Sequence, residues 1–135
     1  MLTNGVITKN NLERFAFTNG TECATPLKGI VLEFHGLNHT ALLAEPNALA
    51  KLCTQKNVVY LFPYYGPWAW MNDTAVSIVD GIIDAAMERY HLPEHTPILS
   101  TGGSMGGQGA LIYTRYTKHT PTACAANCPV CDLPF

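Results

Sequence analysis

The pattern of apolar and polar residues predicts a chain of alternating strands and helices. Short, nearly continuous apolar runs are typical of buried parallel strands, and they occur at 29–34, 58–62, 97–100 and 123–126. Apolar residues at helical spacing predict helices at about 46–53, 74–90 and 110–116. An alternating, aromatic segment at 14–18, followed by the turn signal Asn19-Gly20, predicts a further strand at a sheet edge.

This order of elements predicts the fold class. A strand, a helix and a second strand pair in parallel through a right-handed crossover, and successive helices then cover both faces of the sheet. We expect a single α/β domain over residues 1–135, with three α/β/α layers around a mostly parallel sheet.

Two of the predicted helices have a recognisable buried face. In the helix at 74–90 this face carries Val76, Val79, Ile83, Ala86, Met87 and Tyr90. Asp80, Asp84 and Glu88 are expected on its opposite side, and Asn72 or Asp73 can cap its start. The helix at 46–53 is expected to bury Leu49, Leu52 and Cys53.

Composition and charge narrow the function classes. The residues are 47% hydrophobic, as in a globular fold, and the net charge of -2 offers no positive surface for nucleic acid. No apolar run reaches the roughly 18 residues of a membrane span, and residues 1–5 lack the features of a signal peptide. We expect a cytoplasmic protein with no nucleic-acid partner and no membrane contact.

The cysteines favour free thiols over disulfides or a metal site. The five residues are an odd number and too sparse for a disulfide scaffold: Cys23, Cys53, Cys124, Cys128 and Cys131. Cys128-x-x-Cys131 has a zinc-ligand spacing but no matching second pair, and Cys124 falls in a strand predicted to be buried. No metal is expected.

The chemistry of the chain centres on a glycine-rich turn. Residues 102–106, Gly-Gly-Ser-Met-Gly, fit the G-x-S-x-G pattern between a predicted strand and a predicted helix. A serine at such a sharp corner brings the neighbouring backbone so close that a Cβ would clash, which explains the flanking glycines. The dinucleotide pattern G-x-G-x-x-G fits no register here, and a phosphate-binding loop would need Lys where Gln108 stands. Ser104 is therefore the candidate nucleophile.

A nucleophilic serine also needs hydrogen-bond donors for the oxyanion that forms during attack. The residue after the nucleophile, Met105, supplies one backbone N–H in this arrangement. His35-Gly36-Leu37 follows an earlier predicted strand, so the Leu37 amide is the candidate for the second donor, and Gly36 lets the backbone approach a substrate.

Three segments carry a family resemblance: Phe34-His35-Gly36, the aromatic stretch at 62–72, and the glycine turn at 100–107. Together they resemble the α/β-hydrolase superfamily, nearest to its prolyl-oligopeptidase and dienelactone-hydrolase-like branch, over roughly residues 29–132. The resemblance implies an α/β-hydrolase fold and a serine hydrolase that cleaves small ester or peptide substrates with a Ser-acid-His triad and no cofactor. Ser104 matches the nucleophile, and the Leu37 and Met105 amides match the oxyanion hole.

The chain departs from this family at the acid and the base. In the superfamily the serine is followed by an acid and then by a histidine, whereas here His119 precedes Asp132 and no later histidine exists. Asp132 is either the triad acid or a loop carboxylate, and His119 is expected to be solvated near a helix end. We expect a fold truncated after the strand at 123–126, with little activity of its own. It is then a fragment of a longer hydrolase or is completed by a partner chain that extends the sheet.

The aromatic loop after the strand at 58–62 leaves two interpretations open. Tyr65, Trp68 and Trp70 follow the carboxyl end of a strand, where α/β proteins bind ligands, so they can line a substrate pocket. Large aromatic residues also close over hydrophobic cores. The function is similarly open between a serine hydrolase and a noncatalytic α/β-hydrolase-like binding or interaction module that has kept the serine turn but lost its base.

Overall fold

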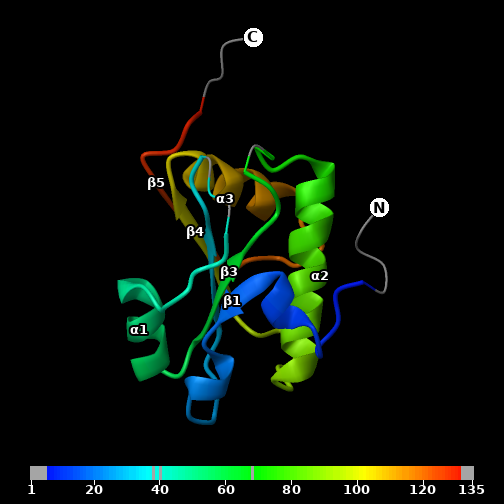
Figure 1. Cartoon of the computed structure of the whole chain (residues 1–135), viewed down its shortest axis with the longest axis vertical. Helices are drawn as coiled ribbons and strands as arrows, with labels where there is room; N and C mark the ends of the chain where they lie inside the picture. The colour runs from blue at the N-terminus through cyan, green and yellow to red at the C-terminus, as the bar shows by residue number, and fades with distance from the viewer. Residues whose placement is uncertain (1–5, 38, 40, 68, 132–135) are drawn as a thin grey trace.

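A five-stranded sheet forms the centre of the computed structural model, which describes residues 6–37, 39, 41–67 and 69–131 (Figure 1). The strand order is β1-β3-β2-β4-β5. The strands are β1 Ala16–Thr18, β2 Ile30–Phe34, β3 Val59–Pro63, β4 Ile98–Gly103 and β5 Ala123–Asn127. All neighbours pair in parallel except β1, which runs antiparallel to β3 at the sheet edge. The α/β class, the mostly parallel sheet and the edge position of the first strand are confirmed.

Helices lie on both faces of the sheet. They are α1 Ala48–Gln55, α2 Asp73–Arg89 and α3 Met105–Tyr116, with short 3-10 turns η1 Leu12–Arg14 and η2 Gly20–Glu22. In Figure 1, α1 and α2 stand on opposite sides of the strands. Of these helices, which belong to the described part of the chain, none is long and apolar enough to cross a membrane.

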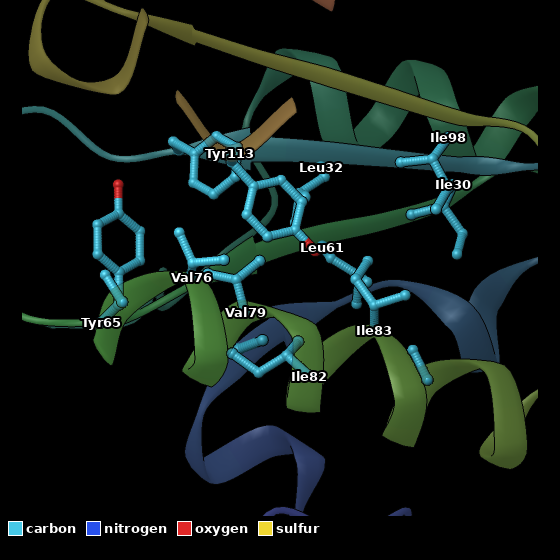
Figure 2. Packing of buried hydrophobic residues seen from close by; sticks show 14 of the residues in the cluster. Ile30, Leu32, Leu61, Tyr65, Val76, Val79, Ile82, Ile83, Ile98 and Tyr113 are labelled. Atoms are coloured by element: carbon cyan, nitrogen blue, oxygen red, sulfur yellow. The ribbon is translucent and has the colours of Figure 1, made fainter. Parts of the chain in front are cut away.

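The alternation of side chains along the strands produces two separate cores. In β2, Ile30, Leu32 and Phe34 point into the larger core, which α2 and α3 cover. Figure 2 shows Ile30 and Leu32 opposite Val79 and other residues of α2. The smaller core lies under α1 and contains Ala50, Cys53, Tyr60 and Phe62.

The structure corrects the expected face of α1. Ala50 and Cys53 are buried, but Leu52 is 49% exposed. The N-cap of the helix is Asn47, whose side-chain oxygen accepts from Ala50 N at 2.8 Å. Asn47 Nδ2 also donates to Tyr60 Oη at 2.9 Å, so this residue both caps α1 and fixes it to β3. The rotation of the helix follows from this anchor, which hydrophobicity alone does not reveal.

The acidic side of α2 is also not simply solvent-facing. Asp80 Oδ1 accepts hydrogen bonds from Tyr113 Oη at 2.7 Å and from Thr117 Oγ1. Asp84 lies against Lys118 Nζ at 2.5 Å. These contacts join α2 to the carboxyl end of α3, so they help to fix the helix that carries the serine turn at its other end.

Replacing Asp80 by alanine should lower the free energy of unfolding by about 2 kcal/mol, because the fully buried Tyr113 would keep a hydroxyl without a partner. Urea denaturation followed by circular dichroism measures this loss. The matched control is Glu88→Ala in the same helix. Among the described residues Glu88 forms one ion pair, an exposed contact to Lys9 at 3.5 Å, so this variant should change little. Equal losses in the two variants would contradict the anchoring role.

The β5 strand forms the second edge of the sheet. Ala123, Ala125 and Asn127 are exposed, whereas Cys124 and Ala126 are only half-buried. The prediction that Cys124 lies in a buried strand is therefore wrong, because no described element covers the outer face of β5. An edge built from small, uncharged side chains lacks the charges that commonly discourage pairing with another strand.

Candidate active site

Ser104 lies at the corner between β4 and α3, at the carboxyl end of the parallel strands. Its backbone has φ 56° and ψ -120°, and its side chain is exposed. A residue with a Cβ rarely adopts this conformation, which costs on the order of 1–3 kcal/mol. The contacts around Ser104 must offset that cost. They come from the glycines of the corner and from a turn after β5.

Two glycines make the corner sterically possible. A Cβ on Gly102 would lie 2.5 Å from the Gly106 carbonyl oxygen. A Cβ on Gly106 would lie 2.9 Å from the His35 carbonyl oxygen and closer still to that of Phe34. The predicted crowding is present, and it arises because α3 starts directly against β2 and β4.

A turn after β5 supports the corner from the other side. Ser104 N donates to the Asn127 carbonyl at 3.1 Å, and Val130 N donates to the Ser104 carbonyl at 3.3 Å. Pro129 packs against Gly107, where an added Cβ would meet the proline at 3.1 Å. Sequence reasoning missed this support, although the Cys128-Pro129 pair after a strand is a turn signal.

The two candidate oxyanion donors belong to segments that lie next to each other. Phe34, the last residue of β2, pairs with Gly102 of β4, so the loop from His35 to Leu37 leaves the sheet beside the serine corner. A Cβ on Gly36 would meet nothing within 4 Å, which leaves open space at this peptide. Met105 is the first residue of α3, and the residue as a whole is 1% exposed. Backbone N–H groups at a helix start favour a developing negative charge.

His35 is a buried histidine beside this corner. Its side chain is 1% exposed, and its Nδ1 lies 2.8 Å from the Gly36 carbonyl oxygen. The ring stacks on Tyr65 with centroids 4.2 Å apart, and it also faces Tyr64 and His39. Burial lowers the pKa of His35 below its ordinary value, so the ring is neutral at neutral pH.

The described part of the aromatic loop contributes buried residues to the larger core. Tyr65 is 7% exposed and belongs to the larger core, where burial raises the pKa of its hydroxyl. Trp70 is half-buried and Met71 is buried, both with positive φ, and Met71 packs near Gly109. Trp68 lies outside the described residues. The substrate-pocket role of Tyr65, Trp68 and Trp70 stays a prediction.

The residues expected to supply an acid or a base are not assembled at the corner. His119 follows α3, which has 12 residues and is about 18 Å long, so it lies far from Ser104. It is not solvated as expected: its side chain is 17% exposed, and its Nε2 lies 2.9 Å from Asp84 Oδ1. Asp132 lies outside the described residues. Among the described histidines, only His35 and His39 lie in loops at the carboxyl end of the sheet.

The described residues contain no group of three or more His, Cys, Asp or Glu side chains arranged to hold a metal ion. All five cysteines are free, and Cys128 and Cys131 are exposed. The chain matches no protein-family model, no curated protein and no solved structure in the comparisons made. A function can therefore be inferred only from the sequence and the geometry of the chain itself.

Proposed function

We propose that this chain is the nucleophile-bearing part of a serine hydrolase of the α/β-hydrolase kind, which cleaves ester or peptide bonds through an acyl-serine intermediate. One observation carries the proposal: an exposed serine in strained backbone at a strand-to-helix corner, where two glycines admit no Cβ. A turn that merely contained a serine would relax to an unstrained conformation, since nothing would select against it. Strain that persists at one reactive side chain favours a functional reason.

In the proposed reaction, Ser104 Oγ attacks the carbonyl carbon of the substrate and forms a tetrahedral intermediate. The N–H groups of Leu37 and Met105 stabilise the negative charge on the former carbonyl oxygen. Collapse of the intermediate breaks the bond to the alcohol or amine and leaves an acyl group on Ser104. Water then hydrolyses this ester and restores the serine. The scheme needs no cofactor.

The reaction also needs a base that takes the proton from Ser104, and the residues that the structure describes offer none in the expected position. His35 is held by the Gly36 carbonyl, and His119 lies beside Asp84 at the far end of α3. A serine hydroxyl at its ordinary pKa is a weak nucleophile, so binding and the oxyanion donors alone would supply only a small rate. We therefore propose that the chain by itself has little activity.

A partner chain is part of the same proposal. The exposed, uncharged β5 edge favours pairing with a further strand, and such a strand lies next to the turn that supports Ser104. A partner that extends the sheet at β5 could bring both the acid and the base to the corner. The alternative is a noncatalytic binding or interaction module, which the lack of a base at Ser104 among the described residues favours.

A fluorophosphonate probe tests the nucleophile directly. Ser104 Oγ would form a bond to phosphorus with loss of fluoride, and we expect slow labelling of the 135-residue chain that maps to Ser104 by peptide mass spectrometry. Ser104→Ala should remove the label. The matched control Ser77→Ala, an exposed serine of α2, should leave it unchanged.

The outcome of this experiment decides between a hydrolase part and a noncatalytic module. Slow labelling confined to Ser104 supports a hydrolase part that lacks its base. Rapid labelling supports the nucleophile but overturns the proposal of little activity. A folded chain that does not label at Ser104 even after prolonged exposure favours the noncatalytic module.

A further inference from the structure

The His35 side chain is hydrogen-bonded to one particular peptide group. Its Nδ1 lies 2.8 Å from the carbonyl oxygen of Gly36, and that carbonyl belongs to the peptide bond joining Gly36 to Leu37. In a planar trans peptide the C=O and N–H groups point in opposite directions. The contact that holds the Gly36 carbonyl toward the imidazole therefore turns the Leu37 N–H away from it.

We propose that His35 is a positioning residue, which fixes the Gly36–Leu37 peptide so that the Leu37 N–H serves as an oxyanion donor. The donor role rests on the proposed hydrolase function. The orientation of the peptide does not, and it can be tested separately. His35 touches no substrate in this proposal and acts only through the backbone.

The local structure explains why the Gly36–Leu37 peptide needs a side chain to fix its orientation. Glycine adopts many backbone conformations, and apart from its chain neighbours no described residue would lie within 4 Å of a Cβ at Gly36, so packing restricts this residue little. Leu37 is also 44% exposed, so its side chain does not anchor the peptide in a core. Among the described residues, the hydrogen bond between the Gly36 carbonyl and the His35 side chain restrains the direction of the Leu37 N–H.

The imidazole is itself well fixed. It is 1% exposed and stacks on Tyr65, which lies in the larger core. Because the Gly36 carbonyl is an acceptor, the neutral ring carries its proton on Nδ1. Nε2 is buried and forms no hydrogen bond among the described residues, so Nδ1 is the ring nitrogen with a hydrogen-bond partner.

The direction of the Leu37 N–H bond can be measured by its residual dipolar coupling. His35→Phe keeps an aromatic ring over Tyr65 but removes the donor, and we expect the Leu37 coupling to change. In His35→Asn, the amide Nδ2 takes about the place of the imidazole Nδ1, and the wild-type coupling should return. The matched control is His95→Phe, at an exposed histidine in the loop before β4, and it should leave Leu37 unchanged.

The labelling rate at Ser104 gives the functional readout. His35→Phe should slow fluorophosphonate labelling by about 10-fold or more, since loss of one oxyanion donor costs at least that much in hydrolases. His35→Asn should recover most of the rate. A wild-type chain that does not label removes the hydrolase proposal, whereas the dipolar couplings still decide the role of His35.

Two results would overturn the positioning role. One is an unchanged Leu37 coupling in folded His35→Phe. The other needs no variant and applies even if the substituted chains fail to fold: nitrogen chemical shifts of the wild-type imidazole that place the proton on Nε2 at neutral pH. Nδ1 could then not donate to the Gly36 carbonyl.

The same geometry predicts a pH dependence of stability. The pKa of His35 lies below its ordinary value of 6.5, first because burial disfavours the charged ring. The unfolded chain therefore binds this proton at a higher pH than the folded chain. The stability that neutral His35 contributes is complete above pH 6.5 and is lost as the pH falls through the lower folded pKa. The titratable side chains that face the ring are His39, Tyr64 and Tyr65.

Urea denaturation across this pH range should show the loss in wild type and in His95→Phe, but not in His35→Phe. A loss of equal size in folded His35→Phe would show that another group is responsible.

Discussion

Replacing Gly106 by alanine should destabilise the chain more than any other single methyl group added near the serine corner. The new Cβ would lie 2.9 Å from the His35 carbonyl oxygen and closer still to the Phe34 carbonyl oxygen. Both oxygens are backbone atoms at the end of β2, so no side chain can rotate away. We expect the free energy of unfolding to fall by at least about 3 kcal/mol, which is the upper end for overpacked cores. Urea denaturation followed by circular dichroism measures this loss.

Gly103, the last residue of β4, provides the matched control in the same glycine-rich turn. A Cβ there would have its nearest neighbour, the Asn127 carbonyl oxygen, at 3.7 Å, an ordinary van der Waals distance. Gly103→Ala should therefore change stability by less than about 0.5 kcal/mol. If both variants were equally stable, α3 would not be seated on β2 as closely as the structure has it, and the steric argument for the corner would be lost.

The strands and helices were largely predictable because their apolar spacing matches their burial. The run at 58–62 became β3, and the helix expected at 74–90 became α2, with Asn72 as its cap. The parallel order followed from the alternation of element types. The antiparallel pairing of β1 did not, because three residues carry no signal about strand direction.

Polar contacts between elements were the part that the sequence could not predict. Asp80 was expected to face solvent from its helical spacing, yet it accepts hydrogen bonds from Tyr113 and Thr117. Hydrophobic periodicity treats every carboxylate as exposed, so it cannot recognise one that joins two helices. The same limitation applies to His119, which contacts Asp84.

The candidate site also has features that the sequence predicts and features that it does not. The glycines around Ser104 were predictable because strain and crowding demand a particular residue type at fixed spacing. The turn at 127–130 was not, because its hydrogen bonds to Ser104 are made by backbone atoms, which any residue type provides. The role of His35 was also hidden, since it depends on the direction of one peptide bond.

Replacing Ser104 by glycine should abolish fluorophosphonate labelling and at the same time stabilise the fold. Glycine adopts φ 56° and ψ -120° without steric cost, so the strain of about 1–3 kcal/mol at this residue would be released. The unfolded chain gains freedom from a glycine, which takes back roughly 0.5–1 kcal/mol. The expected net change is a rise of about 1 kcal/mol in the free energy of unfolding, measured by urea denaturation.

Ser104→Ala separates the two effects, because it removes the hydroxyl but keeps the Cβ. It should lose the label as completely as Ser104→Gly does, yet have about the same stability as wild type. Since the Ser104 hydroxyl does not cap α3, its removal breaks no helix-capping hydrogen bond. A glycine variant less stable than the alanine variant would mean that residue 104 stores no strain. A proposal that rests on strain retained for a reactive hydroxyl would then lose its main support.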